Sequence, residues 1–164
     1  MTRNSMRRPS GFTLIELVMV ILLLGILAAY ALPRWIGQGG FEAQTVRDEI
    51  VARLRLVQGQ NMHEPADRCS WWVTDGSRFA HIAMTPCAAP PALSGWSTAQ
   101  LARGRLVSVS QGVTIAGGQS LQLRFDRLGR PLGSCLGGCQ VTITGGGESV
   151  VLAINAEGYI HALD

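Results

Sequence analysis

A long apolar run near the start of the chain is followed by segments in which apolar and polar residues alternate. From residue 12 to residue 32 every position is apolar except Thr13 and Glu16, and Pro33 follows. A helix rises ~1.5 Å per residue, so a run of this length spans roughly 30 Å, about the hydrocarbon thickness of a bilayer. We therefore expect residues 12–33 to form a transmembrane helix.

Apolar residues at three- and four-residue spacing predict a second helix, from Phe41 to about Met62. This apolar stripe needs a sheet to cover it. Pro33 and the glycines after it predict a helix-poor hinge over Trp35–Gly40, and Glu64-Pro65 ends the second helix. The stripe consists of Ala43, Val46, Ile50, Leu54 and Val57, with Arg47, Asp48, Arg53 and Arg55 away from its centre.

From Cys69 onward the chain consists of short β-type runs separated by turn residues. Ten of the twenty glycines lie between residues 112 and 147, where hairpin turns would use them. The predicted fold class is α+β: a long N-terminal helix, its first half in the membrane, packed against an antiparallel β-sheet domain. The predicted strands cover residues 71–74, 78–84, 105–110, 121–126, 140–144, 150–154 and 159–162.

Excess positive charge is confined to the residues before the apolar run. The first eleven residues contain Arg3, Arg7 and Arg8 and no acid. This arrangement places the N-terminus in the cytoplasm and the chain beyond Pro33 on the far side of the membrane. Without residues 1–11 the arginines and acids balance, so the global charge indicates no acidic partner.

The N-terminal segment admits more than one interpretation. A secretory signal peptide would be cut at Ala29-Tyr30-Ala31, but its apolar part would be shorter than this run and would lack a carboxylate. A plain membrane anchor fits the length but gives no reason for Glu16. A charge inside the span costs at least a few kcal/mol and is usually paired or functional.

A third interpretation accounts for both the length and the carboxylate. The residues Gly11-Phe12-Thr13-Leu14-Ile15-Glu16-Leu17, after a short basic leader, strongly resemble the processing motif of type IV prepilins and pseudopilins. The resemblance implies that a prepilin peptidase cuts between Gly11 and Phe12 and N-methylates Phe12. It also implies that Glu16 pairs with the N-terminal amine of a neighbouring subunit, and that Pro33 matches a proline common in these helices.

The last third of the chain carries a second, less specific resemblance. Residues 121–131, followed by 150–154 and 158–160, are similar to the C-terminal sheet of the H-type minor pseudopilin family. That family also includes minor pilins of type IV and mannose-sensitive haemagglutinin pili.

All four cysteines lie beyond residue 68, which is typical of a disulfide-bearing domain in an oxidising compartment. Sequence alone allows three connectivities. The short glycine-containing loop between Cys135 and Cys139 favours a bond between them, and Cys69 would then pair with Cys87. No C-x-x-C pair or nearby histidine pair supports zinc, so we expect no metal site.

The sequence contains no recognisable catalytic pattern. Its three histidines are scattered, and no serine occupies a G-x-S-x-G elbow, so we expect neither an enzyme nor a cofactor. One group of arginines would supply phosphate contacts to a nucleic acid, although a solvated sheet face is the favoured interpretation. This group is Arg105, Arg124, Arg127 and Arg130.

These observations predict a minor structural subunit of a type IV pilus or a type II secretion pseudopilus. It would cross the bacterial inner membrane once, with its N-terminus cytoplasmic and its C-terminal domain periplasmic, and then enter the filament. Its partners would be other pilin or pseudopilin subunits, the prepilin peptidase/methyltransferase and the inner-membrane assembly platform. The alternative is a secreted or membrane-anchored periplasmic binding domain, with nucleic acid as one ligand. The divisions would be a leader over 1–11, a transmembrane or filament-core helix over 12–33, a hinge and amphipathic helix over 34–63, and a β-rich domain over 64–164.

Overall fold

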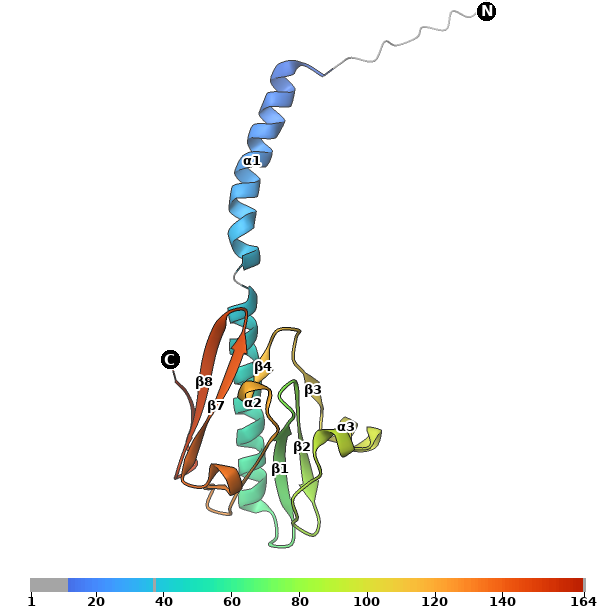
Figure 1. Ribbon diagram of the computed structural model, residues 1–164, viewed down its shortest axis with the longest axis vertical. Helices are drawn as coiled ribbons and strands as arrows, with labels where there is room; N and C mark the ends of the chain where they lie inside the picture. The colour runs from blue at the N-terminus through green and yellow to red at the C-terminus, as the bar shows by residue number, and fades with distance from the viewer. Residues whose placement is uncertain (1–11, 37, 164) are drawn as a thin grey trace, which may run out of the picture. The chain divides into compact units, whose positions relative to one another are not determined.

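The protein is described by a computed structural model that covers the backbone of residues 12–36 and 38–163 and the side chains of residues 12–28 and 41–163. The chain divides into two compact units between Gly37 and Gln38. The first unit contains one helix, α1, from Leu14 to Ile36 (Figure 1). Thr13 starts this helix, because its carbonyl oxygen accepts hydrogen bonds from the backbone N–H groups of Glu16 and Leu17 at 3.1 and 3.2 Å.

Residues 35–36 and 38–40, expected to be poor in helix, are helical, and that part of the expectation is wrong; a hinge in this segment stays a prediction. Pro33 lies inside α1, before its last residue, Ile36. Helix α2 begins at Gln38 and includes two of the glycines. A proline removes one backbone donor and glycines weaken a helix, but the hydrogen bonds of the long helical segments on either side outweigh these local costs.

The second unit is built around α2, which runs from Gln38 to His63. The amphipathic helix expected over 41–62 is confirmed, with a slightly earlier start, and Glu64-Pro65 follows its last residue. The expected stripe faces the core: Ala43, Ile50, Leu54 and Val57 are fully buried, and Val46 packs against the same core partly buried.

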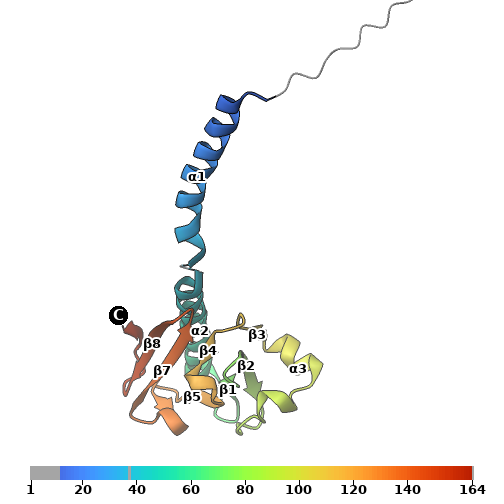
Figure 2. The same cartoon turned by 45° about the horizontal axis from the view of Figure 1, so that its top comes forward.

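Two antiparallel sheets pack against α2, where the sequence indicated one (Figures 1 and 2). The first has the strand order β3-β2-β1-β5-β6, and the second has the order β4-β7-β8-β9. The α+β class and the antiparallel pairing are both confirmed. The strands are β1 (Cys69–Thr74), β2 (Arg78–Met84), β3 (Val107–Ser108), β4 (Thr114–Ile115), β5 (Leu121–Phe125), β6 (Pro131–Leu132), β7 (Gly138–Gly145), β8 (Glu148–Asn155) and β9 (Ile160–Leu163).

Short elements account for most of the differences from the predicted strands. The strand expected over 105–110 shrinks to β3 because Arg105 adopts a left-handed φ of 47°. Helix α3, Thr98–Arg103, was not predicted, although Ser97 and Gln100 form a capping box at its start. Strands β4 and β6 have two residues each, too few for any periodicity. Three 3₁₀ turns complete the unit: η1 (Leu93–Gly95), η2 (Ala116–Gly118) and η3 (Gly133–Cys135).

Strand β1 is buried along its whole length because the first sheet is covered on both faces. Trp72 points into the main core and lies 6.0 Å from Phe79 between ring centroids. Trp71 points to the opposite face, since successive side chains of a strand alternate. There it joins a second core with Leu93 and Trp96, which come from the segment between β2 and α3. That segment therefore covers the outer face of the sheet.

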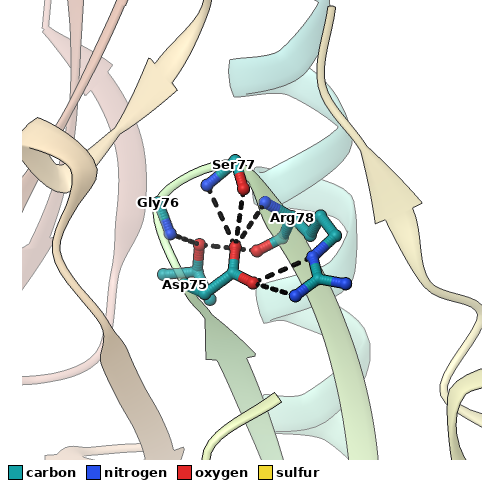
Figure 3. Close-up of polar contacts among 5 residues, drawn as sticks. Asp75, Gly76, Ser77 and Arg78 are labelled. Carbon is teal, nitrogen blue, oxygen red and sulfur yellow. Dashed lines mark hydrogen bonds and ion pairs between the residues drawn. The ribbon is translucent and has the colours of Figure 1, made fainter. Parts of the chain in front are cut away.

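The turn between β1 and β2 is held by Asp75 and connects the two sheets (Figure 3). Oδ1 of Asp75 accepts hydrogen bonds from the backbone N–H groups of Ser77 and Arg78, at 3.1 and 2.8 Å. Oδ2 accepts from the guanidinium of Arg78 at 2.9 and 2.6 Å. Burial tends to raise the pKa of Asp75, but these hydrogen bonds hold it below 3.8. At the same turn, the N–H of Ile115 on β4 donates to the carbonyl of Gly76 at 2.8 Å.

Candidate functional sites

The residues of the predicted processing motif lie at the start of α1. Gly11 is outside the described residues, and Phe12 is 77% exposed. Glu16 lies in the first turn of the helix, where the helix dipole favours a carboxylate. Its side chain is exposed, and within the described part of the chain its carboxylate has no hydrogen-bond or ion-pair partner. Glu16 is therefore accessible to a group from another molecule.

Apart from Glu16, the described side chains of α1 are apolar. No helix within the described ranges meets the length and hydropathy that a membrane span requires. The large apolar residues from Phe12 to Leu27 are nevertheless exposed by 40–81%. An aliphatic surface of this extent is unfavourable in water and is usually covered by lipid or protein.

Two disulfide bonds constrain loops of the second unit. Cys69 at the start of β1 is bonded to Cys87 in the segment after β2, and their Cα atoms lie 5.1 Å apart. Cys135 in η3 is bonded to Cys139 in β7, with Cα atoms 5.0 Å apart. The first bond holds the segment that carries Leu93 and Trp96 against the outer face of the first sheet.

Three of the four candidate arginines line one groove near the end of α2. Arg124, Arg127 and Arg130 share this groove with Arg68 and two acids, Glu64 and Asp126. Arg105 does not line it. Arg105 precedes β3, whereas Arg130 precedes β6, and these strands form opposite edges of the five-stranded sheet. The sheet order, which the sequence does not reveal, separates Arg105 from the other three.

Each of these three arginines also has a partner within the fold. Nη1 of Arg124 donates to Sγ of Cys87 at 2.8 Å, and its guanidinium lies 5.1 Å from the ring centroid of Trp71. Nη2 of Arg127 donates to the Glu64 carbonyl at 3.3 Å. Arg130 pairs with Asp126 at 2.8 Å. Burial tends to raise the pKa of Asp126, but hydrogen bonds from Arg130 and Leu128 hold it below 3.8.

His81 on β2 lies among cations. Its Nδ1 is 3.2 Å from Nη1 of Arg53 on α2, and Nε of Arg53 donates to Glu49 at 2.9 Å. Because an arginine only donates, Nδ1 of His81 accepts and the ring is neutral. Burial, followed by the charges of Arg53 and Arg105, lowers the pKa of His81 below 6.5.

Two amide side chains of α2 that the sequence analysis did not single out bond to the backbone of other segments. Asn61 is 5% exposed, and its Nδ2 donates to the carbonyl of Ser70 at 2.8 Å while its Oδ1 accepts from the Ser70 N–H at 2.6 Å. Nε2 of Gln58 donates to the carbonyls of Gly129 and Gly158 at 2.7 and 2.8 Å. Asn61 lies four residues after Val57 and so continues the helical spacing of the apolar stripe. A polar amide at a position expected to be buried was the sequence signal that could have identified it.

Comparison with known proteins bears on the start of the chain and on the fold. A family described as the prokaryotic N-terminal methylation motif matches residues 6–32. No curated protein matches the chain in sequence. Two crystal structures of the type IV minor pilin FimU from Pseudomonas aeruginosa (strain PAO1) are similar. The P21 form has a TM-score of 0.50 and 17% identity, covering 75% of this chain and 89% of that chain. The P65 form has a TM-score of 0.49 and 14% identity, covering 74% and 92%.

The matched motif contains Gly11, Phe12 and Glu16. The similarity to the P21 structure, at its low identity, concerns the fold alone. Across the described residues no group of His, Cys, Asp or Glu side chains is arranged to hold a metal ion. The chain is therefore type IV pilin-like in two respects: it carries the prokaryotic N-terminal methylation motif, and its fold is similar to that of the type IV minor pilin FimU.

Proposed function

We propose that the protein is a minor structural subunit of a type IV pilus or a type II secretion pseudopilus. The observation that carries this proposal is the apolar surface of α1, whose large apolar side chains are exposed from Phe12 to Leu27 and lie within the matched methylation motif, residues 6–32. In a subunit of this kind, an apolar helix is covered in two successive environments. Lipid surrounds it before assembly, and the helices of neighbouring subunits surround it in the filament.

The proposed path begins in the bacterial inner membrane, with the N-terminus in the cytoplasm and the second unit in the periplasm. The prepilin peptidase removes residues 1–11 and methylates Phe12, and the assembly platform moves the subunit into the filament. The new amine at Phe12 then has a carboxylate to pair with, Glu16 of a neighbouring subunit. Support comes from the matched motif over residues 6–32 and from the unpartnered, exposed carboxylate in the described part of the chain.

The full chain expressed with a prepilin peptidase tests this proposal by intact-mass analysis. We expect loss of residues 1–11 and the addition of one methyl group. Gly11→Val should abolish this processing, because the motif places the cut after that glycine. Gly25→Val is the matched control, since nothing lies within 4 Å of a Cβ built at Gly25. Cleavage after Ala31 would instead establish a secreted domain and overturn the proposal.

Nucleic-acid binding stays a prediction from the sequence. Arg124, Arg127 and Arg130 share a groove, but two acids lie within it and Arg105 lies at the far edge of the sheet. Among the described residues of the second unit, no specific contact favours this function over filament assembly.

A further inference from the structure

One edge of the first sheet is left open beside a polar groove. Strand β2 pairs with β1 along its whole length, but β3 covers only Arg78 and Phe79 on the other side. Beyond them, the N–H of His81 donates to the carbonyl of Gly104 at 3.1 Å. Within the described ranges, the rest of β2 has no neighbouring strand on this side.

Ala83 presents its backbone groups at this open edge. In a strand the N–H and C=O of alternate residues point to the same side. Since the N–H of His81 points away from β1, both backbone groups of Ala83 do so as well. Ala83 is exposed, and neither group has a hydrogen-bond partner among the described residues. On β1, by contrast, the corresponding gap at Ser70 is filled by the side chain of Asn61.

The polar side chains that line the groove beside this edge are either positively charged or uncharged. It has a volume of about 400 Å³ and lies between the end of α2, strand β2 and helix α3, which Figure 1 shows beside β2. No carboxylate is among its lining residues. Arg68, whose side chain is 50% exposed, contacts Glu64 through Nε at 3.3 Å and retains its other N–H groups. The polar side chains lining the groove are Gln60, Arg68, His81, Thr85, Gln100 and Arg103.

We propose that this groove binds an extended segment of a partner polypeptide that carries an acidic side chain. The segment adds to β2 as a further strand, exchanging backbone hydrogen bonds with Ala83. Its carboxylate meets Arg103, which pairs with no acid among the described residues, and the N–H groups of Arg68 that Glu64 leaves free. The unpaired edge fixes the extended conformation of the ligand, and the two arginines select its charge. This proposal is independent of the chain's role in a filament.

The probe is the blocked peptide acetyl-Thr-Val-Glu-Val-Thr-amide, added to the isotope-labelled full chain in detergent micelles. We expect the amide resonance of Ala83 to shift in a saturable way, with smaller shifts at Arg68 and Arg103. The same peptide with lysine in place of glutamate should bind at least about tenfold more weakly, because two cations then face a third. Equal affinity for the two peptides would overturn the proposal, as would the absence of any shift with the glutamate peptide.

Variants of the chain separate the two parts of the recognition. Ala83→Pro removes the edge donor without removing an existing hydrogen bond, and should abolish binding, whereas Ala83→Ser keeps the donor and should bind as the wild type does. Arg103→Gln should weaken binding between about twofold and fivefold, as expected for an exposed ion pair. Arg127→Gln removes an equal charge outside this groove and should have no effect.

Competing occupants would give different results, each of which contradicts the proposal. If oligothymidylate displaces the peptide and shifts Ala83, the groove is a phosphate site. If the Ala83 resonance broadens with protein concentration before peptide is added, a second copy of the chain occupies the edge. Binding that survives Ala83→Pro would place the peptide elsewhere.

Discussion

Asn61 and Ser70 exchange two hydrogen bonds through which a helix side chain completes a β-sheet ladder. Strand β5 pairs with β1 only over Trp72–Thr74, so the N–H and C=O of Ser70 have no strand opposite them. The amide of Asn61 bonds to both groups, at 2.6 and 2.8 Å. Both residues are buried, at 5% and 0% exposure, so water does not provide a substitute.

Replacing Asn61 by alanine should therefore be costly. It leaves two buried backbone groups unpaired, and each such group costs about 1–3 kcal/mol. We expect Asn61→Ala to lower the free energy of unfolding by about 2–4 kcal/mol, measured from urea midpoints at constant slope. Gln60→Ala is the matched control, because Gln60 is the neighbouring residue of α2 and lines the groove beside β2. Equal losses for the two variants would show that the Asn61 bonds contribute nothing specific.

A second prediction concerns Gly158, which meets Gly129 and Gln58. Gly158 has a φ of 91°, and a Cβ there would overlap the Gly129 carbonyl oxygen and lie 2.8 Å from Nε2 of Gln58. Gly112 has a similar φ of 89° but nothing within 4 Å of its Cβ position. In both variants alanine must adopt a left-handed backbone conformation, which lowers stability by a similar amount. Only Gly158→Ala also creates steric overlap. We expect Gly158→Ala to be less stable than Gly112→Ala by about 2 kcal/mol or more in thermal unfolding.

The third prediction is a pH dependence set by His81. Its folded-state pKa is lowered, so the unfolded chain takes up this proton more readily than the folded protein. Stability from this site is complete above pH 6.5 and is lost as the pH falls from there through the folded-state pKa. Arg53 contacts the ring and pairs with Glu49, and the charge of Arg105 also acts on the ring.

His81→Gln should flatten this loss, because an amide oxygen can accept from Arg53 without titrating. Urea midpoints measured between about pH 7.5 and pH 5 provide the test. If wild type and His81→Gln lose stability in parallel over this range, another group is responsible.

The sequence predicted the elements that have a clear periodicity, and failed where long-range pairing decides. The stripe through Ile50 and Leu54 identified α2, and the alternation of Leu121 and Leu123 identified β5. Local patterns do not specify strand order, so the separation of Arg105 from Arg130 could not be anticipated. Arg105 itself illustrates the other failure, because its positive φ ends a strand that its neighbours would extend. The proposed binding site at Ala83 exists because the edge of β2 is left uncovered, and this follows from the strand order of the folded sheet, which the sequence does not reveal.

The fourth prediction concerns Glu16. In a low-dielectric surrounding, the pairing of its carboxylate with the Phe12 amine of a neighbour would favour one axial register between subunits. Glu16→Ala should leave membrane insertion intact or improve it, and reduce filament incorporation at least about tenfold. Membrane and sheared-filament fractions of the two proteins are compared by immunoblot. Glu16→Gln is the control for side-chain size and should fail in the same way, since the charge is what pairs. Equal incorporation of wild type and Glu16→Ala would exclude a role for this carboxylate in assembly.

Two glycine-bearing hairpins of the second unit, β1–β2 and β7–β8, tolerate an insertion to different degrees. The β1–β2 turn supplies the Gly76 carbonyl to Ile115, and a Cβ at Gly76 would collide with the backbone of Gly118. The β7–β8 turn closes through Gly146 and Gly147, both with positive φ, and nothing lies within 4 Å of a Cβ at Gly147. An epitope tag or fluorophore site therefore belongs at 146–147, because an insertion at Gly76 would separate the sheets it was meant to report on.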